Sequence, residues 1–387
     1  MINISKLYCG LAGVSDELRY PARRDIKPIV VFNCTPRCNL NCVHCYSSSE
    51  AADRAPQLST QQAKLLIDQI ADFGCPVLLF SGGEPLLRED VFELMAYARD
   101  KHLRTVLSTN GTRITESVAR TLADLGLSYA GISLDGPQEV HDRFRKVDGA
   151  FLSTLCGIAN CRKAGIRTGL RFTMTRGNLD HIETIFEIAA AAGVGRICFY
   201  HLIRTGRARE LTEQTPSDPQ IRRAVDTLLQ CTADRVRQGV VEEVLTVGNH
   251  ADGPYLLMQM QAEGHPQYAT AADLLTRAAG NRIGQNIASV NWDGQVFPDQ
   301  FWRTYSLGNI LDKPFGQIWQ NETDPVLRIL RNKRDHKDPK CARCRWFDFC
   351  LGNFRSLTGA ADLADWQNEP PCYLTEQEIA PRSAKNS

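Results

Sequence analysis

The feature that most constrains the fold of this chain is an alternation between residues 28 and 202. Short apolar runs rich in β-branched residues occupy 29–32, 77–80, 105–107, 130–134, 168–174 and 196–202. Between them, residues 59–73, 90–100, 115–125, 151–164 and 178–192 have helical periodicity. Strands that alternate with helices indicate parallel strands joined by right-handed crossovers. Six such units are too few for a closed eight-fold barrel, so we expect an α/β fold built on an open, partial (β/α)6 barrel.

Polar motifs follow the first four apolar runs. They are the cysteine triplet Cys38, Cys42 and Cys45, then Gly82-Gly83-Glu84-Pro85, Thr109-Asn110-Gly111 and Asp135-Gly136. The carboxyl ends of parallel strands meet at one rim, where α/β proteins build their active sites. The sequence therefore predicts an active site at that rim.

The fourteen cysteines are distributed unevenly. Seven fall into two groups near the chain ends: Cys38, Cys42 and Cys45, then Cys341, Cys344, Cys350 and Cys372. Structural disulfides are rare in reducing compartments, so grouped cysteines there indicate a metal or cluster site.

Composition and charge exclude several classes of function. The net charge of +1 gives no field that attracts nucleic acid or an anionic membrane. No apolar run approaches the ~20 residues that span a bilayer, and the N-terminus lacks the pattern of a secretory signal. We therefore expect a cytoplasmic protein without nucleic-acid or membrane partners.

The pattern also suggests how the chain is divided. We expect an N-terminal arm over 1–27, the barrel over 28–240 and a polar, irregular connector with some helix over 241–280. A smaller domain over 281–375 would contain a β-hairpin with its turn at Asp293-Gly294, and 376–387 would form a loose tail.

The triplet Cys38-x3-Cys42-x2-Cys45 offers three thiolates. A four-iron cluster normally takes four cysteines, so three would leave one iron with an open position for a ligand. The alternative is a zinc site completed by a histidine. His44 is poorly placed for it because it adjoins Cys45.

The segment 38–45 and the motifs at the following strand ends resemble the radical SAM superfamily over residues 28–202. The resemblance implies that the cysteine triplet holds a [4Fe–4S] cluster whose open iron binds S-adenosylmethionine (SAM), which is cleaved reductively to a 5′-deoxyadenosyl radical. Glu84 or nearby carbonyls would take the methionyl ammonium of SAM, and Ser133 with Arg145 its carboxylate. For Arg145 the alternative is a solvated surface charge. The implied SAM-binding residues are Tyr46, Gly82, Gly83, Glu84, Pro85, Ser108, Asn110, Ser133 and Arg145.

The second cysteine group supplies four thiolates. Four ligands complete a [4Fe–4S] cluster, but they also suit structural zinc, and the spacing alone leaves the two open. Residues 290–298 and 307–310 resemble the SPASM/twitch extensions of radical SAM proteins. The two-cluster extensions carry further cysteines where this chain has Gly280, Asp299 and Phe354, so the resemblance implies a single auxiliary cluster, and two [4Fe–4S] clusters in all.

Segments 199–207, 298–303 and 341–347 resemble the radical SAM proteins of heme d1 biosynthesis, which remove two propionate side chains from a didecarboxylated siroheme. The resemblance implies a tetrapyrrole substrate and an electron donor such as flavodoxin or ferredoxin. A flat anion needs aromatic rings and guanidinium groups, which makes His201, Arg204, Arg207 and Arg303 candidate substrate contacts. The alternative is a solvated charge for each arginine and a hydrogen-bonded structural role for His201.

Three alternative functions remain open from the sequence. Sister enzymes of the alternative haem pathway decarboxylate tetrapyrrole side chains, and radical SAM peptide maturases also carry SPASM-type extensions. Maturases often have a winged-helix segment before the barrel, for which residues 1–27 are too short. A non-enzymatic scaffold with two zinc sites is the third alternative.

Overall fold

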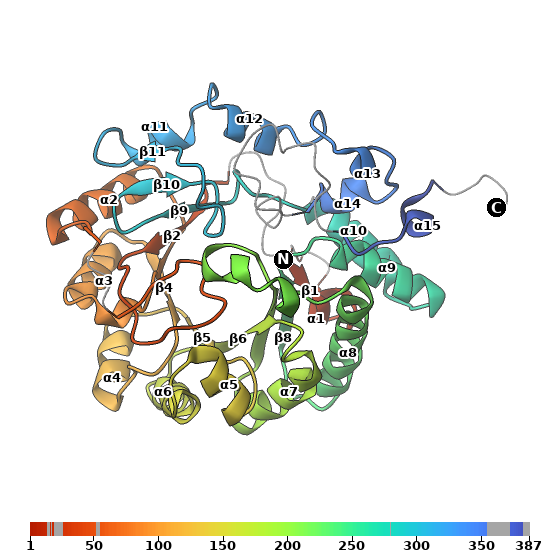
Figure 1. The fold of residues 1–387 in the computed structure, drawn as a ribbon, viewed down its shortest axis with the longest axis horizontal. Coiled ribbons are helices and arrows are strands. Elements are labelled where there is room, and N and C mark those ends of the chain that lie inside the picture. The colour runs from red at the N-terminus through yellow and green to blue at the C-terminus, as the bar shows by residue number, and fades with distance from the viewer. Residues whose placement is uncertain are drawn as a thin grey trace.

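A single curved sheet organises the computed structural model, which describes residues 1–13, 16, 18, 26–51, 55–278, 280–353 and 372–381. Its described strands lie in the order β1-β8-β7-β6-β5-β4-β3-β2-β9-β10-β11, with helices around the outside of the curve (Figure 1). The strands are β1 (Ile2–Asn3), β2 (Ile29–Asn33), β3 (Val77–Ser81), β4 (Arg104–Thr109), β5 (Ala130–Ser133), β6 (Thr168–Met174), β7 (Arg196–His201), β8 (Glu243–Val247), β9 (Ile287–Val290), β10 (Gln295–Phe297) and β11 (Gly308–Asn309).

The helices cover the sheet with apolar faces. The α-helices are α1 (Ile4–Leu7), α2 (Thr60–Asp72), α3 (Val91–Asp100), α4 (Glu116–Asp124), α5 (Gln138–Arg145), α6 (Ala150–Lys163), α7 (Ile182–Ala191), α8 (Asp218–Arg237), α9 (Asp252–Ala262), α10 (Tyr268–Ala278), α11 (Phe315–Trp319), α12 (Pro325–Arg331), α13 (Pro339–Ala342), α14 (Phe347–Cys350) and α15 (Glu376–Ile379). Short 3₁₀ helices are η1 (Pro85–Leu87), η2 (Leu179–His181), η3 (Gly206–Glu210) and η4 (Thr212–Gln214). No helix in the described residues is long and apolar enough to cross a membrane.

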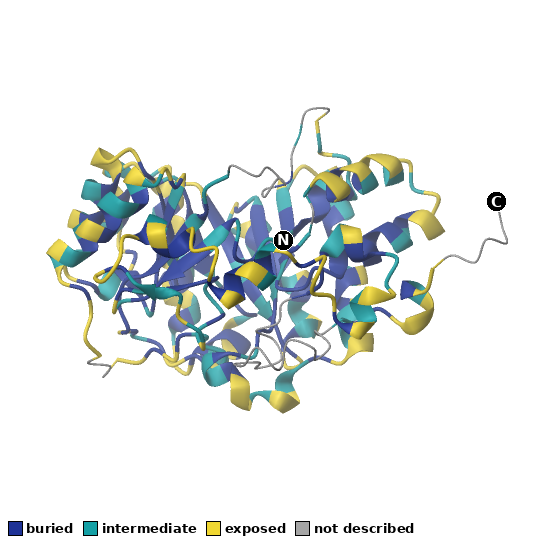
Figure 2. Ribbon diagram, turned by 90° about the horizontal axis from the view of Figure 1, so that it is seen from above, coloured by how far each residue is buried: buried dark blue, intermediate teal, exposed yellow. Residues whose placement is uncertain are grey.

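Helix α2 illustrates why these segments become helices. Ser59 caps it by accepting from the Gln62 amide while the Gln62 side chain accepts from the Ser59 amide, a reciprocal capping box. Ala63, Leu66, Ile67 and Ile70 recur at helical spacing and are buried. Figure 2 shows the general result, with buried strands inside and exposed outer faces on the helices.

The predicted partial barrel is confirmed. Strands β2 to β7 occupy the six predicted apolar runs, and each pairs in parallel with the next. The loops after these strands therefore share one rim, as the sequence predicted.

Segment 241–280 differs from the expected polar connector. It contains β8, which pairs in parallel with β7 and in antiparallel with β1, followed by α9 and α10. The strand is a run of only five residues that starts at Glu243, so its periodicity is weak in the sequence. The strand is stabilised by contacts with distant parts of the chain. One of them is the hydrogen bond that the Ser5 hydroxyl accepts from the Val244 amide.

The predicted hairpin is present as β9 and β10, and it is attached to the barrel. Strand β9 pairs in parallel with β2, with Ile29 opposite Ile287 and Phe32 opposite Val290. The first strand of the predicted small domain thus continues the barrel sheet. The residues that follow β2 and those that follow β9 consequently lie side by side.

The predicted loose tail is ordered where it is described. Helix α15 is held by Arg222, whose Nη1 donates to Glu378 Oε2 at 3.0 Å, and by Trp346, whose Nε1 donates to the Glu378 carbonyl at 3.0 Å. Residues 382–387 and Phe354 lie outside the described residues.

Candidate active site

The cysteine triplet lies in the loop after β2, at the carboxyl rim of the sheet. Cys38 and Cys42 are buried and Cys45 is half-buried. Burial raises the pKa of the Cys38 thiol to about 12 and also raises the pKa of Cys42. Such thiols ionise when a cation binds them, so the donor set fits an iron cluster.

Arg207, at the start of η3, holds this loop in place. Its Nε donates to the Cys42 carbonyl at 2.8 Å and its Nη1 to the Ser49 carbonyl at 3.0 Å. Its backbone amide donates to the Cys45 carbonyl at 3.0 Å. This predicted substrate residue therefore positions the cysteine loop.

The Gly-Gly-Glu-Pro motif pairs with the same loop. The Gly83 amide donates to the Thr35 carbonyl and the Glu84 amide to the Arg37 carbonyl, both at 2.8 Å. A Cβ atom on Gly83 would lie 2.1 Å from the Arg37 carbonyl oxygen. Glycine is required there because two backbone segments touch.

Glu84 is fully buried and turned toward β4. Its carboxylate accepts from the Thr109 hydroxyl and the Asn110 amide, each at 2.8 Å, and from the Leu86 amide at 3.2 Å. Burial raises its pKa to about 6. Glu84 thus joins the ends of β3 and β4.

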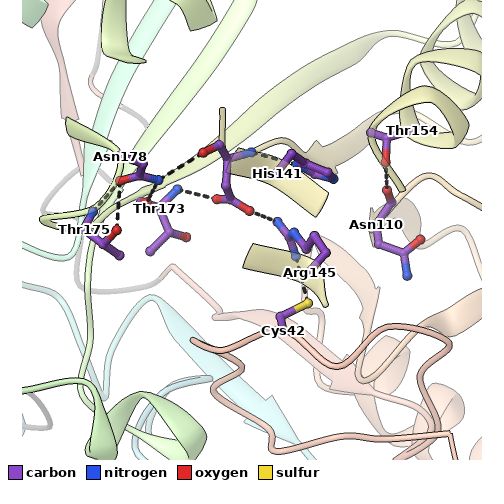
Figure 3. A network of polar contacts seen from close by, with 9 residues as sticks. Cys42, Asn110, His141, Arg145, Thr154, Thr173, Thr175 and Asn178 are labelled. Carbon is purple, nitrogen blue, oxygen red and sulfur yellow. Dashed lines mark hydrogen bonds and ion pairs between the residues drawn. The ribbon is translucent and has the colours of Figure 1, made fainter. Parts of the chain in front are cut away.

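Arg145 is buried in a polar network at the ends of β5 and β6 (Figure 3). It pairs with Asp135, and its Nη1 donates to Cys42 Sγ at 3.3 Å. Asp135 Oδ1 also accepts from the Thr173 amide at 3.0 Å. Burial alone would raise the pKa of Asp135, but Arg145 and nearby histidines outweigh it and hold the pKa below its ordinary value. The alternative of a solvated surface charge is wrong for Arg145.

A cavity of about 150 Å³ brings most of the predicted residues together. Its walls include Cys38, Cys42, Cys45, Tyr46, Gly82, Gly83, Ser108, Asn110, Ser133, Arg145 and His201. Glu84, Pro85, Arg204, Arg207 and Arg303 are not on its walls. We call this space the rim cavity.

Tyr46 and Arg303 connect the rim to the hairpin. The Tyr46 hydroxyl donates to Asn33 Oδ1 at 2.8 Å, and Asn33 Nδ2 donates to Asn291 Oδ1 at 3.1 Å. Arg303 Nη1 donates to the same Asn291 oxygen at 2.8 Å, and its guanidinium lies 5.0 Å from the Trp292 ring. Arg303 is therefore linked to Tyr46 through the side chains of Asn291 and Asn33.

The other two predicted substrate residues also have partners in the protein. His201 Nε2 is 2.9 Å from Asp252 Oδ2, and the other oxygen of Asp252 accepts from the Tyr373 hydroxyl at 2.8 Å. Arg204 donates to the Thr212 hydroxyl at 3.3 Å. These contacts fit a hydrogen-bonded structural role for His201.

The second cysteine group is assembled from α13, α14 and the segment after 371. Cys341, Cys344, Cys350 and Cys372 are all half-buried. The pKa of Cys341 is raised by burial, by Asp338 and by the proximity of Cys350 and Cys372, so three of the four thiols are neighbours. No three His, Cys, Asp or Glu side chains in the described residues converge tightly enough for a single metal ion. Four thiolates suit a [4Fe–4S] cluster and structural zinc alike.

Sequence reasoning missed two residues that face the barrel interior, Arg171 and Tyr129. Arg171 lines the rim cavity, and both line the space beneath it. The sequence signal that could have identified Arg171 is its charge, because it stands within the otherwise apolar run of β6.

Comparisons with known proteins agree with this geometry. The model of the radical SAM superfamily matches residues 32–189, and that of the iron–sulfur cluster-binding SPASM domain matches 282–345. The chain is 46% identical to the Fe-coproporphyrin III synthase of Methanosarcina barkeri, over 98% of this chain and 99% of that protein. It is 35% identical to the pre-heme d1 synthase of Dinoroseobacter shibae, over 94% and 91%.

Among solved structures, SuiB of Streptococcus suis bound to its precursor peptide SuiA superposes with a TM-score of 0.67 at 16% identity, covering 86% of this chain and 72% of SuiB. This likeness concerns the fold. The chain therefore belongs to the radical SAM superfamily, as an enzyme with a SPASM domain that uses SAM and iron–sulfur clusters, in the family of heme-biosynthesis enzymes.

Proposed function

We propose that this enzyme removes side chains from a didecarboxylated siroheme and forms Fe-coproporphyrin III. The observation that carries the proposal is the 46% identity to an Fe-coproporphyrin III synthase across 98% of the chain. Removal of propionates on the route to heme d1, the function expected from the sequence, is the second candidate. It is supported by 35% identity over 94% of the chain.

Cys38, Cys42 and Cys45 would hold a [4Fe–4S] cluster with one open iron. When bound, this cluster and SAM supply hydrogen-atom abstraction by a SAM-derived radical. Arg145 and Asn110 aim donors at the sulfurs of Cys42 and Cys38, at 3.3 and 4.0 Å. Hydrogen bonds to cluster sulfurs adjust the reduction potential.

The rim cavity supplies groups for the charged end of SAM. The backbone of Gly82 and Gly83 lines this cavity, so its carbonyls would be available to a ligand ammonium. The Ser133 hydroxyl and the Arg145 guanidinium, which also line the cavity, suit the SAM carboxylate. Glu84 acts indirectly by holding Asn110 at the end of β4.

The second group, Cys341, Cys344, Cys350 and Cys372, would hold one auxiliary [4Fe–4S] cluster. Four thiolates leave no open iron, so this site suits electron transfer or scaffolding. A flavodoxin or ferredoxin would supply the electron.

The test is an anaerobic reaction of the reconstituted enzyme with didecarboxysiroheme, SAM and dithionite, followed by chromatography and mass spectrometry. We expect a product that co-elutes with authentic Fe-coproporphyrin III and 5′-deoxyadenosine that rises with it. The Cys42→Ala variant should form neither. A product that has lost two propionates would support the heme d1 candidate instead, and an unchanged tetrapyrrole beside abundant 5′-deoxyadenosine would refute both.

A further inference from the structure

A second cavity, of about 400 Å³, lies inside the barrel. Inward side chains of β2, β3, β4, β6, β7 and β8 line it, and no cysteine of either group is on its walls. We call this space the lumen cavity. It shares four wall residues with the rim cavity: Arg171, Tyr200, Gln300 and Phe301. The two spaces therefore adjoin at these residues, and Arg171 lies at the boundary between them.

Arg171 places a cation at this junction. Its Nη1 donates to the Ser108 hydroxyl, and no carboxylate in the described residues forms an ion pair with it. Arg196, which lines the same cavity, pairs with Glu243 at 3.1 Å. A guanidinium enclosed by protein is stabilised by an anionic partner, so Arg171 is suited to receive one from a ligand.

The sheet is shaped to accommodate this guanidinium. A Cβ atom on Gly131, in the neighbouring strand β5, would lie 2.4 Å from Arg171 Nε. The glycine therefore leaves the space in which the arginine lies against β5 and faces the cavity.

Tyr129 presents a second donor to the lumen. Tyr129 is 4% exposed, and its hydroxyl has no hydrogen-bond partner among the described residues. Burial raises its pKa to about 12, so the hydroxyl remains protonated at neutral pH. A Cβ atom on Gly169, which pairs with Gly131, would lie 2.2 Å from the Tyr129 hydroxyl, so Tyr129 and Arg171 lie over the same pair of glycines. A guanidinium without a carboxylate partner and a phenol without an acceptor, both among the described residues, suit a carboxylate ligand.

We propose that Arg171 and Tyr129 bind a carboxylate side chain of the tetrapyrrole inside the barrel, an inference that rests on the proposed function. The carboxylate of SAM is the other possible source of this chemistry. The substrate is favoured because the lumen cavity extends away from the cysteine loop and because Tyr200 and Phe301 offer aromatic faces at the junction.

The test compares binding by variants of the reconstituted enzyme without turnover. Didecarboxysiroheme binding is followed by anaerobic absorbance titration, and SAM binding by equilibrium dialysis of labelled SAM. We expect Arg171→Met to weaken didecarboxysiroheme binding about 10- to 100-fold, the scale of one charge-assisted hydrogen bond, with SAM binding within about twofold of wild type. Arg328→Met is the matched control, because Arg328 is exposed and lies on the walls of neither cavity, so the variant's affinities should not change.

A methyl-esterified tetrapyrrole separates carboxylate recognition from a general structural role. Wild type should prefer the free acid over the ester, and Arg171→Met should lose most of that preference. If Arg171→Met does not fold, the same titrations are made with Tyr129→Phe and Arg171→Lys. We expect about 2- to 10-fold weaker didecarboxysiroheme binding for each.

Two results would overturn the inference while leaving the proposed function intact. One is wild-type didecarboxysiroheme affinity in Arg171→Met, and the other is a selective loss of SAM binding, which would assign the subsite to SAM. Absence of didecarboxysiroheme binding by the wild-type enzyme would instead overturn the proposed function and this inference with it.

Discussion

The ion pair between Asp135 and Arg145 should be among the most costly interactions to disrupt in this protein. Asp135 is 0% exposed and Arg145 is 6% exposed. The substitution Asp135→Asn keeps the side-chain shape and an oxygen that can accept from the Thr173 amide. It removes the negative charge and leaves the buried Arg145 guanidinium without its carboxylate partner.

The expected magnitude follows from this burial. Removing one partner of a buried ion pair costs about 3–5 kcal/mol, whereas an exposed pair contributes about 0–1 kcal/mol. Arg334 and Asp348 form such an exposed pair, with side chains 60% and 67% exposed. Asp348→Asn is therefore a matched control with the same chemical change.

Hydrogen exchange measured by mass spectrometry on the anaerobic holoenzyme gives the required local free energies. Peptides from α5 in Asp135→Asn should exchange about 100- to 5,000-fold faster than in wild type, the equivalent of about 3–5 kcal/mol. Peptides around Asp348 in the control should change by less than about fivefold. The double variant Asp135→Leu with Arg145→Met, which removes both charges, should recover much of the protection. Exchange in Asp135→Asn within about fivefold of wild type would refute this account of the pair.

Three further predictions concern the cysteine groups and the backbone between them. Alanine at any one of Cys38, Cys42 or Cys45 should abolish reductive SAM cleavage while circular dichroism stays native, and normal 5′-deoxyadenosine production would contradict the cluster assignment. Cys341→Ala or Cys372→Ala should lower the iron content to about four atoms per chain but leave SAM cleavage measurable. Unchanged iron with loss of zinc would identify that site as structural zinc. Gly83→Ala should lose iron at the rim because its Cβ would meet the Arg37 carbonyl at 2.1 Å, whereas Gly13→Ala, with nothing within 4 Å, should retain it.

The barrel and much of its rim could be predicted because their signals are local. Alternating periodicity located β2 to β7, and the motifs at their ends were brought together by parallel pairing. Strand β8 was not predicted, since five residues at the end of a polar stretch carry too little periodicity. Its place is set by pairing with β7 and with the N-terminal β1.

The directions in which charged side chains point were harder to predict than the places of the strands that carry them. Arg207 was expected to face the substrate because it follows β7 among aromatic residues, but it donates to the carbonyls of Cys42 and Ser49. An irregular loop leaves carbonyls without secondary-structure partners, and a nearby arginine satisfies them. Arg171 was overlooked because it stands inside an apolar run that predicts a strand, and not among the motifs after a strand. Arg171 lines a cavity because the sheet is curved and its side chain lies on the inward face.

Asn33 explains how the barrel and the hairpin are kept in register. It is fully buried, and its side-chain amide donates to Ser289 Oγ and to Asn291 Oδ1, both at 3.1 Å. Ser289 and Asn291 are two residues apart, so they lie on the same face of β9 and its extension. A slip of β9 by one residue along β2 would place Ala288 and Val290 there and leave the buried amide of Asn33 without acceptors. The polar contacts at this point therefore select one register, and that register holds the hairpin beside Tyr46 and the cysteine loop.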